Sequence, residues 1–284
     1  MAKEGLISII IPSYNRAEVI GKSIQSVLQQ SYSNLEIIVV DDGSSDNTKE
    51  VVEAIQDDRV KYVYQNNQGA CAARNNGFAH AKGEFIALND SDDVWHTDKL
   101  KRQIDLLKSE DVDVVCCRLA IIRNQKPILL PKRIKDRCVL KSDDFFGIGT
   151  QTLLMKRAVL ESEVFDDNIP RLQDLEWLMR VLGKFKVYCI GDGLVDYSIN
   201  SDSITKDAKK LYDALHIIRE KHPNVTKDYC QIAMHSIKDL IQNKEEILKA
   251  GISQQEYKKL FKSWMPNVFK YVYYYIKNAW ILNR

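Results

Sequence analysis

Apolar runs alternate with helical patterns along the first third of the chain. Five runs are rich in β-branched and other apolar residues, as expected for buried strands: Leu6–Ile11, Leu35–Val40, Val60–Tyr64, Glu84–Leu88 and one within Val112–Ile122. Between them, apolar residues recur every three or four positions, which predicts helices. Ser45 and Thr97 are the expected N-caps of two of these helices. Alternating strands and helices predict an α/β fold with a mostly parallel central sheet.

The pattern changes twice after the fifth predicted strand. Residues 126–205 are less regular, with an apolar run at Leu153–Met155 and a helix at about residues 172–182. From residue 206 onward the pattern is helical, with Pro223 as a break. We therefore predict an α/β domain over residues 3–205 and a helical C-terminal extension over residues 206–284.

Composition excludes several classes of protein. The 284 residues include 41 basic and 39 acidic side chains, a net charge of +2 that gives no reason to expect nucleic acid as a partner. The six cysteines contain no C-x-x-C pair, so we expect reduced thiols and a cytoplasmic protein. No apolar stretch is long enough to span a membrane, and the run that ends at Pro12 is too short for a signal peptide. Dinucleotide and P-loop glycine motifs are absent.

Acidic side chains cluster directly after two of the predicted strands. Asp41 follows the second strand, and Asp90, Asp92 and Asp93 follow the fourth. Ligands of parallel sheets bind beyond the carboxyl ends of the strands, where both clusters fall. Three carboxylates in four residues repel one another unless positive charge lies among them. Mg²⁺ or Mn²⁺, which bridge carboxylates to substrate phosphates, would supply that charge. An acidic turn that caps the next helix is the alternative.

The same acidic string also fits a phosphatase pattern. Asp90, Asp92 and Val94 match D-x-D-x-[T/V], which resembles the haloacid dehalogenase family and would make Asp90 a nucleophile. In that family the motif follows the first strand, whereas here three strands precede the one that leads into Asp90. The position argues against a phosphatase.

Other residues near the predicted sheet edge suit a nucleotide. Asp41 can accept hydrogen bonds from a ring N–H or a ribose hydroxyl, and Tyr14 offers a face for stacking. Arg74 could present a planar fork to phosphate oxygens. Each also has an ordinary structural explanation: a turn for Asp41, a capping aromatic for Tyr14 and a solvated helix residue for Arg74. Their shared edge with the carboxylate cluster favours a ligand site.

Four segments together resemble the family 2 glycosyltransferases, which have the GT-A fold: residues 9–16, 40–48, 69–75 and 88–93. The resemblance implies that Asp41 reads the uracil, that Arg74 lies near the base and diphosphate, and that Asp92 binds the metal. Asp90 would reach the ribose or the metal. The residues implied to bind the nucleotide-sugar are Pro12, Tyr14, Asn15, Asp41, Arg74, Asp90 and Ser203.

The implied catalytic base is Asp174. In the family a Glu-Asp pair opens a helix beside the acceptor, and its Asp is the base of an inverting displacement; here the pair is Gln173-Asp174. The ordinary alternative for Asp174 is a carboxylate placed in a first helical turn by the helix dipole. Two further departures are Ser198 and Asn200, which stand where the family commonly has arginine and histidine.

The implied reaction is transfer of a hexose, such as Glc, Gal or an N-acetyl form, from a UDP-sugar to a saccharide hydroxyl during surface-polysaccharide synthesis. The acceptor could be lipid-linked at the inner face of the plasma membrane. A module that binds nucleotide-sugars without turnover is a further alternative. Residues 263–284 place apolar and aromatic residues on one face with flanking lysines. That face could contact a membrane, the catalytic domain or a second copy in a homodimer.

Overall fold

The computed structural model describes residues 2–123, 126–131, 138–140, 147–197, 207–225 and 230–264. The chain forms two compact units, one of residues 1–168 and 173–201 and the other of residues 169–172 and 202–284. The predicted domain boundary at residues 205–206 lies outside the described residues.

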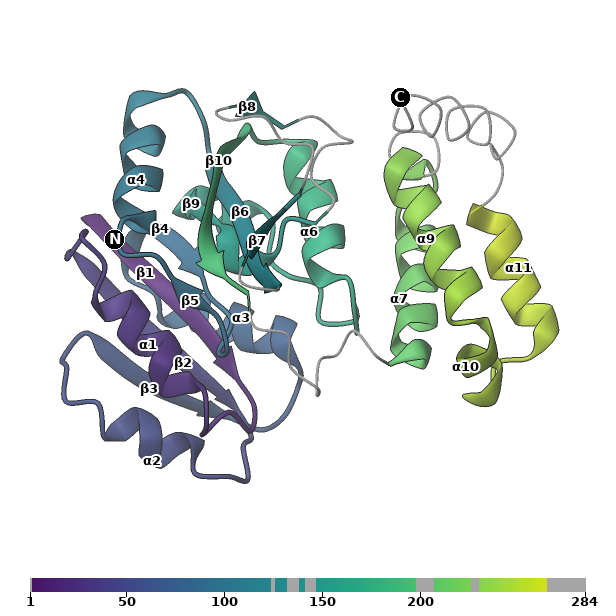
Figure 1. Cartoon of the computed structure of the whole chain (residues 1–284), viewed down its shortest axis with the longest axis horizontal. Helices are drawn as coiled ribbons and strands as arrows, with labels where there is room; N and C mark the ends of the chain where they lie inside the picture. Colours follow the sequence, from purple (N-terminus) through teal and green to yellow (C-terminus); the bar gives the residue numbers. More distant parts are fainter. Residues whose placement is uncertain are drawn as a thin grey trace. The chain divides into compact units, whose positions relative to one another are not determined.

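The first unit is built on a mixed sheet (Figure 1). Its strands are β1 (Lys3–Ser13), β2 (Leu35–Asp42), β3 (Val60–Gln65), β4 (Gly83–Leu88), β5 (Val94–Trp95), β6 (Val114–Arg123), β7 (Lys126–Leu130), β8 (Cys138–Val139), β9 (Leu154–Lys156) and β10 (Val187–Asp196). The main order is β3-β2-β1-β4-β9-β6-β10-β5. Strands β3, β2, β1 and β4 are parallel, as the alternating pattern predicts. Strand β9 is antiparallel to both of its neighbours, so the sheet is mixed beyond β4.

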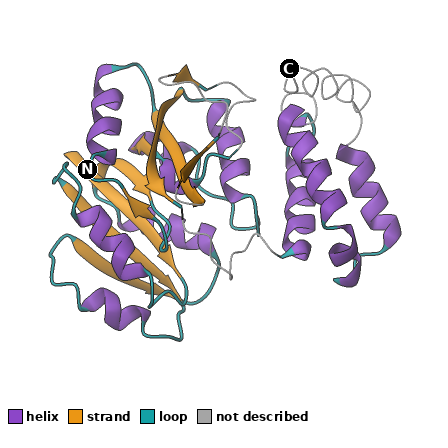
Figure 2. Ribbon diagram, in the orientation of Figure 1, coloured by secondary structure: helices purple, strands orange, loops and turns teal. Residues whose placement is uncertain are grey.

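Helices pack around this sheet (Figure 2). They are α1 (Ile20–Leu28), α2 (Thr48–Glu53), α3 (Ala70–His80), α4 (Lys99–Ser109), α5 (Arg157–Ser162) and α6 (Gln173–Leu182), with a 3₁₀ turn η1 at Thr150–Thr152. Both predicted N-caps are wrong. The residue before α2 is Asn47, and the Ser45 hydroxyl donates to Asn15 Oδ1 over 3.4 Å rather than capping the helix. The residue before α4 is Asp98.

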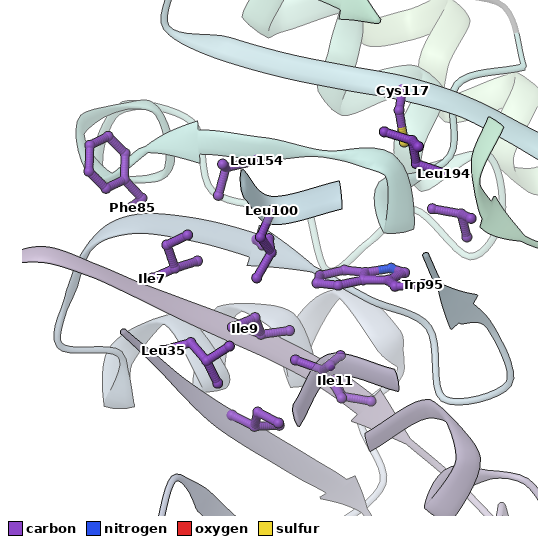
Figure 3. Packing of buried hydrophobic residues seen from close by; sticks show 14 of the residues in the cluster. Ile7, Ile9, Ile11, Leu35, Phe85, Trp95, Leu100, Cys117, Leu154 and Leu194 are labelled. Carbon is purple, nitrogen blue, oxygen red and sulfur yellow. The ribbon is translucent and has the colours of Figure 1, made fainter. Parts of the chain in front are cut away.

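The core lies on both faces of the central strands. Ile7, Ile9 and Ile11 point to one side of β1 and pack with residues from β2, β4, α4 and β9, as Figure 3 shows. Helix α3 packs closely on β1, because a Cβ atom at Gly77 would lie 2.4 Å from Cγ2 of Ile10. Glycine at this position therefore lets α3 lie against the sheet, and α3 carries Arg74.

The second unit is a helical bundle. Its helices are α7 (Ala208–Lys221), α9 (Cys230–Gln242), α10 (Lys244–Lys249) and α11 (Gln254–Trp264). Leu211, Leu215, Ile218 and Leu260 are buried in it, and the Tyr257 hydroxyl donates to the Leu240 carbonyl over 3.0 Å. Within the described part of the chain, no helix has the length and apolarity needed to cross a membrane. Most of the segment predicted to contact a membrane, from residue 265 onward, is not described.

Candidate functional site

The loops that follow β1 and β2 are joined by hydrogen bonds. The Asn15 backbone N–H donates to Ser44 Oγ over 2.8 Å, and Asn15 Oδ1 accepts from the Ser45 N–H over 2.8 Å. Asn15 has a positive φ of 52°, which asparagine tolerates better than most residues. Pro12 is buried in β1 opposite Val40. The structure thus gives Asn15 and Pro12 roles in loop and strand geometry, while Tyr14 is 49% exposed beside them.

Asp41 lies beneath this pair of loops, with only 1% of its surface exposed. Its Oδ1 accepts from the Ser44 N–H over 2.8 Å, and its Oδ2 accepts from the Tyr62 hydroxyl over 2.5 Å. Burial and the Asp41 carboxylate both raise the pKa of Tyr62, so this hydroxyl stays a donor. A carboxylate has four acceptor positions, so Asp41 retains capacity for a ligand N–H. Tyr62 is a site residue that the sequence did not single out.

The neighbouring Asp42 has a structural role, because its carboxylate accepts hydrogen bonds from the segment before α3. It accepts hydrogen bonds from the Gln65 side chain and from the backbone N–H groups of Gln68 and Gly69, each over 2.8 Å. Gly69 precedes α3 and has a φ of 93°, which favours glycine. Asp42 therefore fixes the start of α3 and so helps to place Arg74.

Arg74 joins three distant segments. Its Nη2 donates to Asp90 Oδ1 over 2.9 Å and to Thr150 Oγ1 over 3.2 Å, and its Nη1 donates to Gln173 Oε1 over 3.0 Å. The side chain is nearly buried, and its guanidinium lies 5.5 Å from the centre of the Phe165 ring. The structure thus brings Arg74, Asp90 and the Gln173-Asp174 pair together. Thr150 was missed because nothing near it in the sequence indicates its partners.

The residue after Arg74 reinforces this arrangement. Asn75 donates from Nδ2 to the Phe165 carbonyl over 2.8 Å and accepts from the Phe165 N–H over 3.0 Å. Phe165 in turn stacks on Trp177 of α6, with ring centres 5.2 Å apart. Arg74 and Asn75 thus connect α3 to α6, which carries the candidate base in its first turn.

The loop after β4, residues 89–93 (the carboxylate loop), is held by buried polar side chains of α1 and of Gln30, which follows that helix. Ser23 Oγ donates to the Asp90 carbonyl over 3.1 Å and accepts from Asn89 Nδ2 over 2.9 Å. Ser26 Oγ accepts from the Trp95 N–H over 3.1 Å, and Gln30 Nε2 donates to the carbonyl of His96 over 2.8 Å. These contacts fix the backbone around Asp90, and none of them is signalled by the sequence pattern.

Within the loop, the carboxylates differ in exposure. The Asp90 side chain is 31% exposed, Asp92 is partly buried and Asp93 is fully buried. In the described ranges, no three His, Cys, Asp or Glu side chains are grouped to hold a metal ion. The loop thus offers one or two carboxylates, which fits Mg²⁺ or Mn²⁺ because these ions commonly take their remaining ligands from phosphate and water.

Asp174 lies in the first turn of α6. Its Oδ1 accepts from the Leu175 N–H over 2.8 Å. Burial raises the pKa of Asp174, while the Leu175 N–H and Arg74 act to lower it and Asp90 adds to the rise. A carboxyl group with a raised pKa is a better proton acceptor at neutral pH than a solvated aspartate.

The pKa of Tyr197 responds to the same carboxylates. Burial raises the pKa of its hydroxyl, and the charges of Asp93, Asp90, Asp92 and Asp174 add to this rise. The hydroxyl therefore stays neutral at physiological pH. The predicted site residue Ser203, and the departures Ser198 and Asn200, lie outside the described residues.

Comparison with known proteins identifies the family of this chain. The family described as glycosyl transferase family 2 matches residues 8–161. A relative from Escherichia coli, the UDP-Glc:alpha-D-GlcNAc-diphosphoundecaprenol beta-1,3-glucosyltransferase WfgD, is 34% identical over 220 residues, which are 74% of this chain and 85% of the relative.

Two solved structures share the fold. The S. aureus TarS 1–349 complex with UDP-GlcNAc has a TM-score of 0.70 and 18% identity, covering 91% of this chain and 79% of that one. The mannosyltransferase PcManGT from Pyrobaculum calidifontis, in complex with GDP-Man and Mn²⁺, has a TM-score of 0.58 and 16% identity, covering 91% and 83%. The predicted GT-A fold is confirmed.

Proposed function

Because the chain belongs to glycosyl transferase family 2, we propose that it transfers a hexose from a UDP-sugar to a saccharide hydroxyl with inversion. The observation that carries this proposal is the position of Arg74, which contacts Asp90 of the carboxylate loop and Gln173 beside Asp174. One buried guanidinium thus links the loop proposed to hold the donor diphosphate to the helix proposed to hold the base.

The proposed base is Asp174. The acceptor hydroxyl oxygen bonds to the anomeric carbon as that carbon's bond to the UDP oxygen breaks, and the hydroxyl proton passes to the Asp174 carboxylate. Attack from the side opposite the leaving group inverts the anomeric centre. The raised pKa of Asp174 makes this transfer more favourable, and activity should fall as pH drops below that pKa, because a protonated carboxyl accepts no proton.

We assign cation binding to Asp92, with Mn²⁺ or Mg²⁺ as the ion. Asp90, whose Oδ1 already accepts from Arg74, is the weaker candidate for direct contact and is proposed to orient the ribose or complete the ion's shell. A divalent cation at this place would neutralise the charge that builds on the diphosphate as it leaves. The Mn²⁺ in the PcManGT complex supports this assignment.

The uridine is assigned to the loops after β1 and β2. Tyr14 is exposed for stacking, and Asp41 retains capacity to accept a ring N–H. Pro12 and Asn15 would shape these loops through their backbone positions. The contact of Ser203 with the diphosphate rests on the family resemblance.

For the acceptor, we infer a sugar on a lipid diphosphate. WfgD, by its name, glucosylates GlcNAc-diphosphoundecaprenol, so UDP-Glc and a GlcNAc-diphosphate lipid are the first substrates to test. An acceptor of this kind fits surface-polysaccharide synthesis at the inner face of the plasma membrane. We also propose residues 3–205 as the catalytic domain and residues 206–284 as the helical extension.

Membrane contact through the C-terminal helices is part of this proposal. Helix α11 exposes Lys258, Lys259 and Lys262 on one face, which suits anionic lipid. Co-sedimentation with anionic vesicles should fall when the three lysines are changed to glutamine. Unchanged co-sedimentation would remove this support, and sedimentation velocity of the free protein would test the homodimer.

The deciding experiment is a nucleotide-release assay over UDP-, GDP- and TDP-sugars. It uses Mn²⁺, Mg²⁺ or chelator, with wild type, Asp92→Asn and Asp174→Asn. We expect release of UDP only, lost with chelator and in both variants. Asp174→Asn should still bind UDP, because only the base is removed. Turnover that survives chelator and both substitutions would overturn the mechanism.

The two alternatives make other predictions. A phosphatase of the haloacid dehalogenase type would need Asp90 after a first strand, but Asp90 follows β4 and its carboxylate accepts from Arg74. Family membership also speaks against it. A binding module would hold UDP-sugar without releasing UDP, and Asp174→Asn would then have no activity to remove.

A further inference from the structure

Residues 163–165, which follow α5, connect α6 to α3 within the α/β unit. They belong to no helix or strand, so side chains satisfy much of their backbone. The first two carbonyls accept hydrogen bonds from α6, one from Trp177 Nε1 over 2.6 Å and one from Arg180 Nη2 over 2.9 Å. Both backbone groups of the third residue are bound by Asn75 of α3. The place of α6 against α3 therefore depends on a few polar side chains.

Arg180 makes most of these contacts from the α6 side. Its Nε and Nη2 donate to the two carboxylate oxygens of Glu176, one turn earlier in α6, over 2.9 and 3.0 Å. Its Nη1 leaves the helix and donates to Glu163 Oε2 over 2.5 Å. Burial acts to raise the pKa of Glu163, but hydrogen bonds from Lys184 and Arg180 hold that pKa below its usual value, so the carboxylate stays charged. Buried carboxylates need such a partner, and a planar guanidinium serves both at once.

The contacts of Arg180 lead to the candidate site. Phe165, the last residue of the segment, stacks on Trp177 of α6, and the Arg74 guanidinium lies 5.5 Å from the centre of the Phe165 ring. Asp174 lies six residues before Arg180 on the same helix, about 9 Å along its axis. Because a short helix moves as a rigid rod, a tilt allowed at Arg180 displaces Asp174 from Arg74.

We propose that Arg180 is a positioning residue for catalysis, which fixes α6 to residues 163–165 and thereby sets where the first turn of α6 presents Asp174. This inference rests on the proposed role of Asp174 as the base. Every residue in the argument belongs to the α/β unit.

The test uses the full chain with Arg180→Met, Arg180→Lys and Glu163→Gln. A misplaced base slows the chemical step, so Arg180→Met should lower kcat by about ten- to a hundredfold. The Kd for UDP should stay unchanged, because the uridine is assigned to the loops after β1 and β2. Arg180→Lys should recover part of the rate, since an ammonium keeps the charge but cannot serve both carboxylates and the Val164 carbonyl.

The matched control is Lys184→Met. Lys184 pairs with the same Glu163 carboxylate, but its side chain is 59% exposed and follows the end of α6. The control removes one positive charge from the cluster and leaves the bonds of Arg180 in place, so its kcat should match wild type.

Two readouts separate positioning from a general loss of stability. Burial raises the pKa of Asp174, so a displaced and better hydrated Asp174 should move the acid limb of the kcat profile of Arg180→Met to lower pH. A smaller amount of folded enzyme would not move that limb. Hydrogen–deuterium exchange over residues 173–178 should also speed up in Arg180→Met and stay unchanged in Lys184→Met.

Several outcomes would overturn the inference: wild-type kcat in a folded Arg180→Met, equal losses of kcat and UDP affinity, an acid limb that stays in place, or a Lys184→Met enzyme as slow as Arg180→Met. If Arg180→Met does not fold, Arg180→Lys and Glu163→Gln decide by the same readouts. If wild type releases no UDP from any donor, the proposed function fails, and the exchange data still decide whether Arg180 fixes α6.

Discussion

Lys99, the first residue of α4, is a buried cation of the α/β unit. Its replacement by methionine tests how much this buried charge lowers the free energy of unfolding. The side chain is fully buried. Its Nζ donates to Gln103 Oε1 over 2.9 Å and lies 3.7 Å from the centre of the Trp95 ring. Burial lowers the pKa of Lys99 from 10.5 to about 8, against a smaller opposing effect of the Cys117 and Cys116 thiols.

The size of the effect follows from this pKa. Each pKa unit corresponds to about 1.4 kcal/mol, so a fall from 10.5 to about 8 corresponds to about 3 kcal/mol. Attraction of the ammonium to the Trp95 ring, up to about 2 kcal/mol, reduces the net effect to between about 1 and 3 kcal/mol. Between pH 8 and 10.5 the unfolded chain binds more protons at Lys99 than the folded chain, so the free energy of unfolding rises with pH in that window. Below pH 8 the full penalty applies.

Urea titrations of wild type and Lys99→Met at several pH values between 7 and about 10.5, read by circular dichroism, measure this effect. The variant should gain stability relative to wild type at pH 7 and lose that advantage toward the top of the range. The hydrogen bond to Gln103 that the variant lacks contributes an offset that stays constant with pH, so the trend of the stability difference with pH reports the ionisation of Lys99. Lys101→Met, an exposed position on the same helix that pairs with Asp105, is the control and should show no such trend. A stability difference that stays constant with pH would refute the buried-cation reasoning.

Three further substitutions test the site and its support. Arg74→Lys should lower kcat/KM by about a hundredfold, because an ammonium cannot reach three separated acceptors as a planar fork does; the nucleotide-release assay measures this. Ser23→Ala should lower the free energy of unfolding by about 1–2 kcal/mol in urea titrations and raise the Mn²⁺ concentration for half-maximal activity, since it leaves buried Asn89 without its acceptor. Gly77→Ala should lower stability by about 1–3 kcal/mol in the same titrations, because its Cβ would overlap Ile10.

The positions of the acidic clusters could be predicted because topology alone sets them. Strands that alternate with helices run parallel, so residues that follow β2 and β4 must reach the same edge of the sheet. Asp41 lies at the carboxyl end of β2 and Asp90 follows β4, and β1 lies between these two strands in the sheet. The strand order alone therefore brings these two carboxylates to one edge of the sheet.

The supporting contacts could not be predicted, because they depend on which segments cover which face. Helix α1 shows apolar residues at helical spacing, and the remaining face reads as solvent-exposed. In the structure that face carries buried Ser23 and Ser26, because the loop after β4 folds over it. The partnership of Thr150 with Arg74 likewise joins residues 76 positions apart.

The charges around Tyr197 bear on how the donor would bind. Four carboxylates, those of Asp90, Asp92, Asp93 and Asp174, act on its hydroxyl, and the guanidinium in contact with Asp90 is that of Arg74. One guanidinium cannot balance four carboxylates together with the two negative charges of an incoming diphosphate. Because Gln173 is neutral where the family has glutamate, this chain adds no further negative charge beside Arg74. The remaining excess favours entry of the diphosphate together with a divalent cation, so the affinity for UDP should depend on Mn²⁺ even in Asp174→Asn.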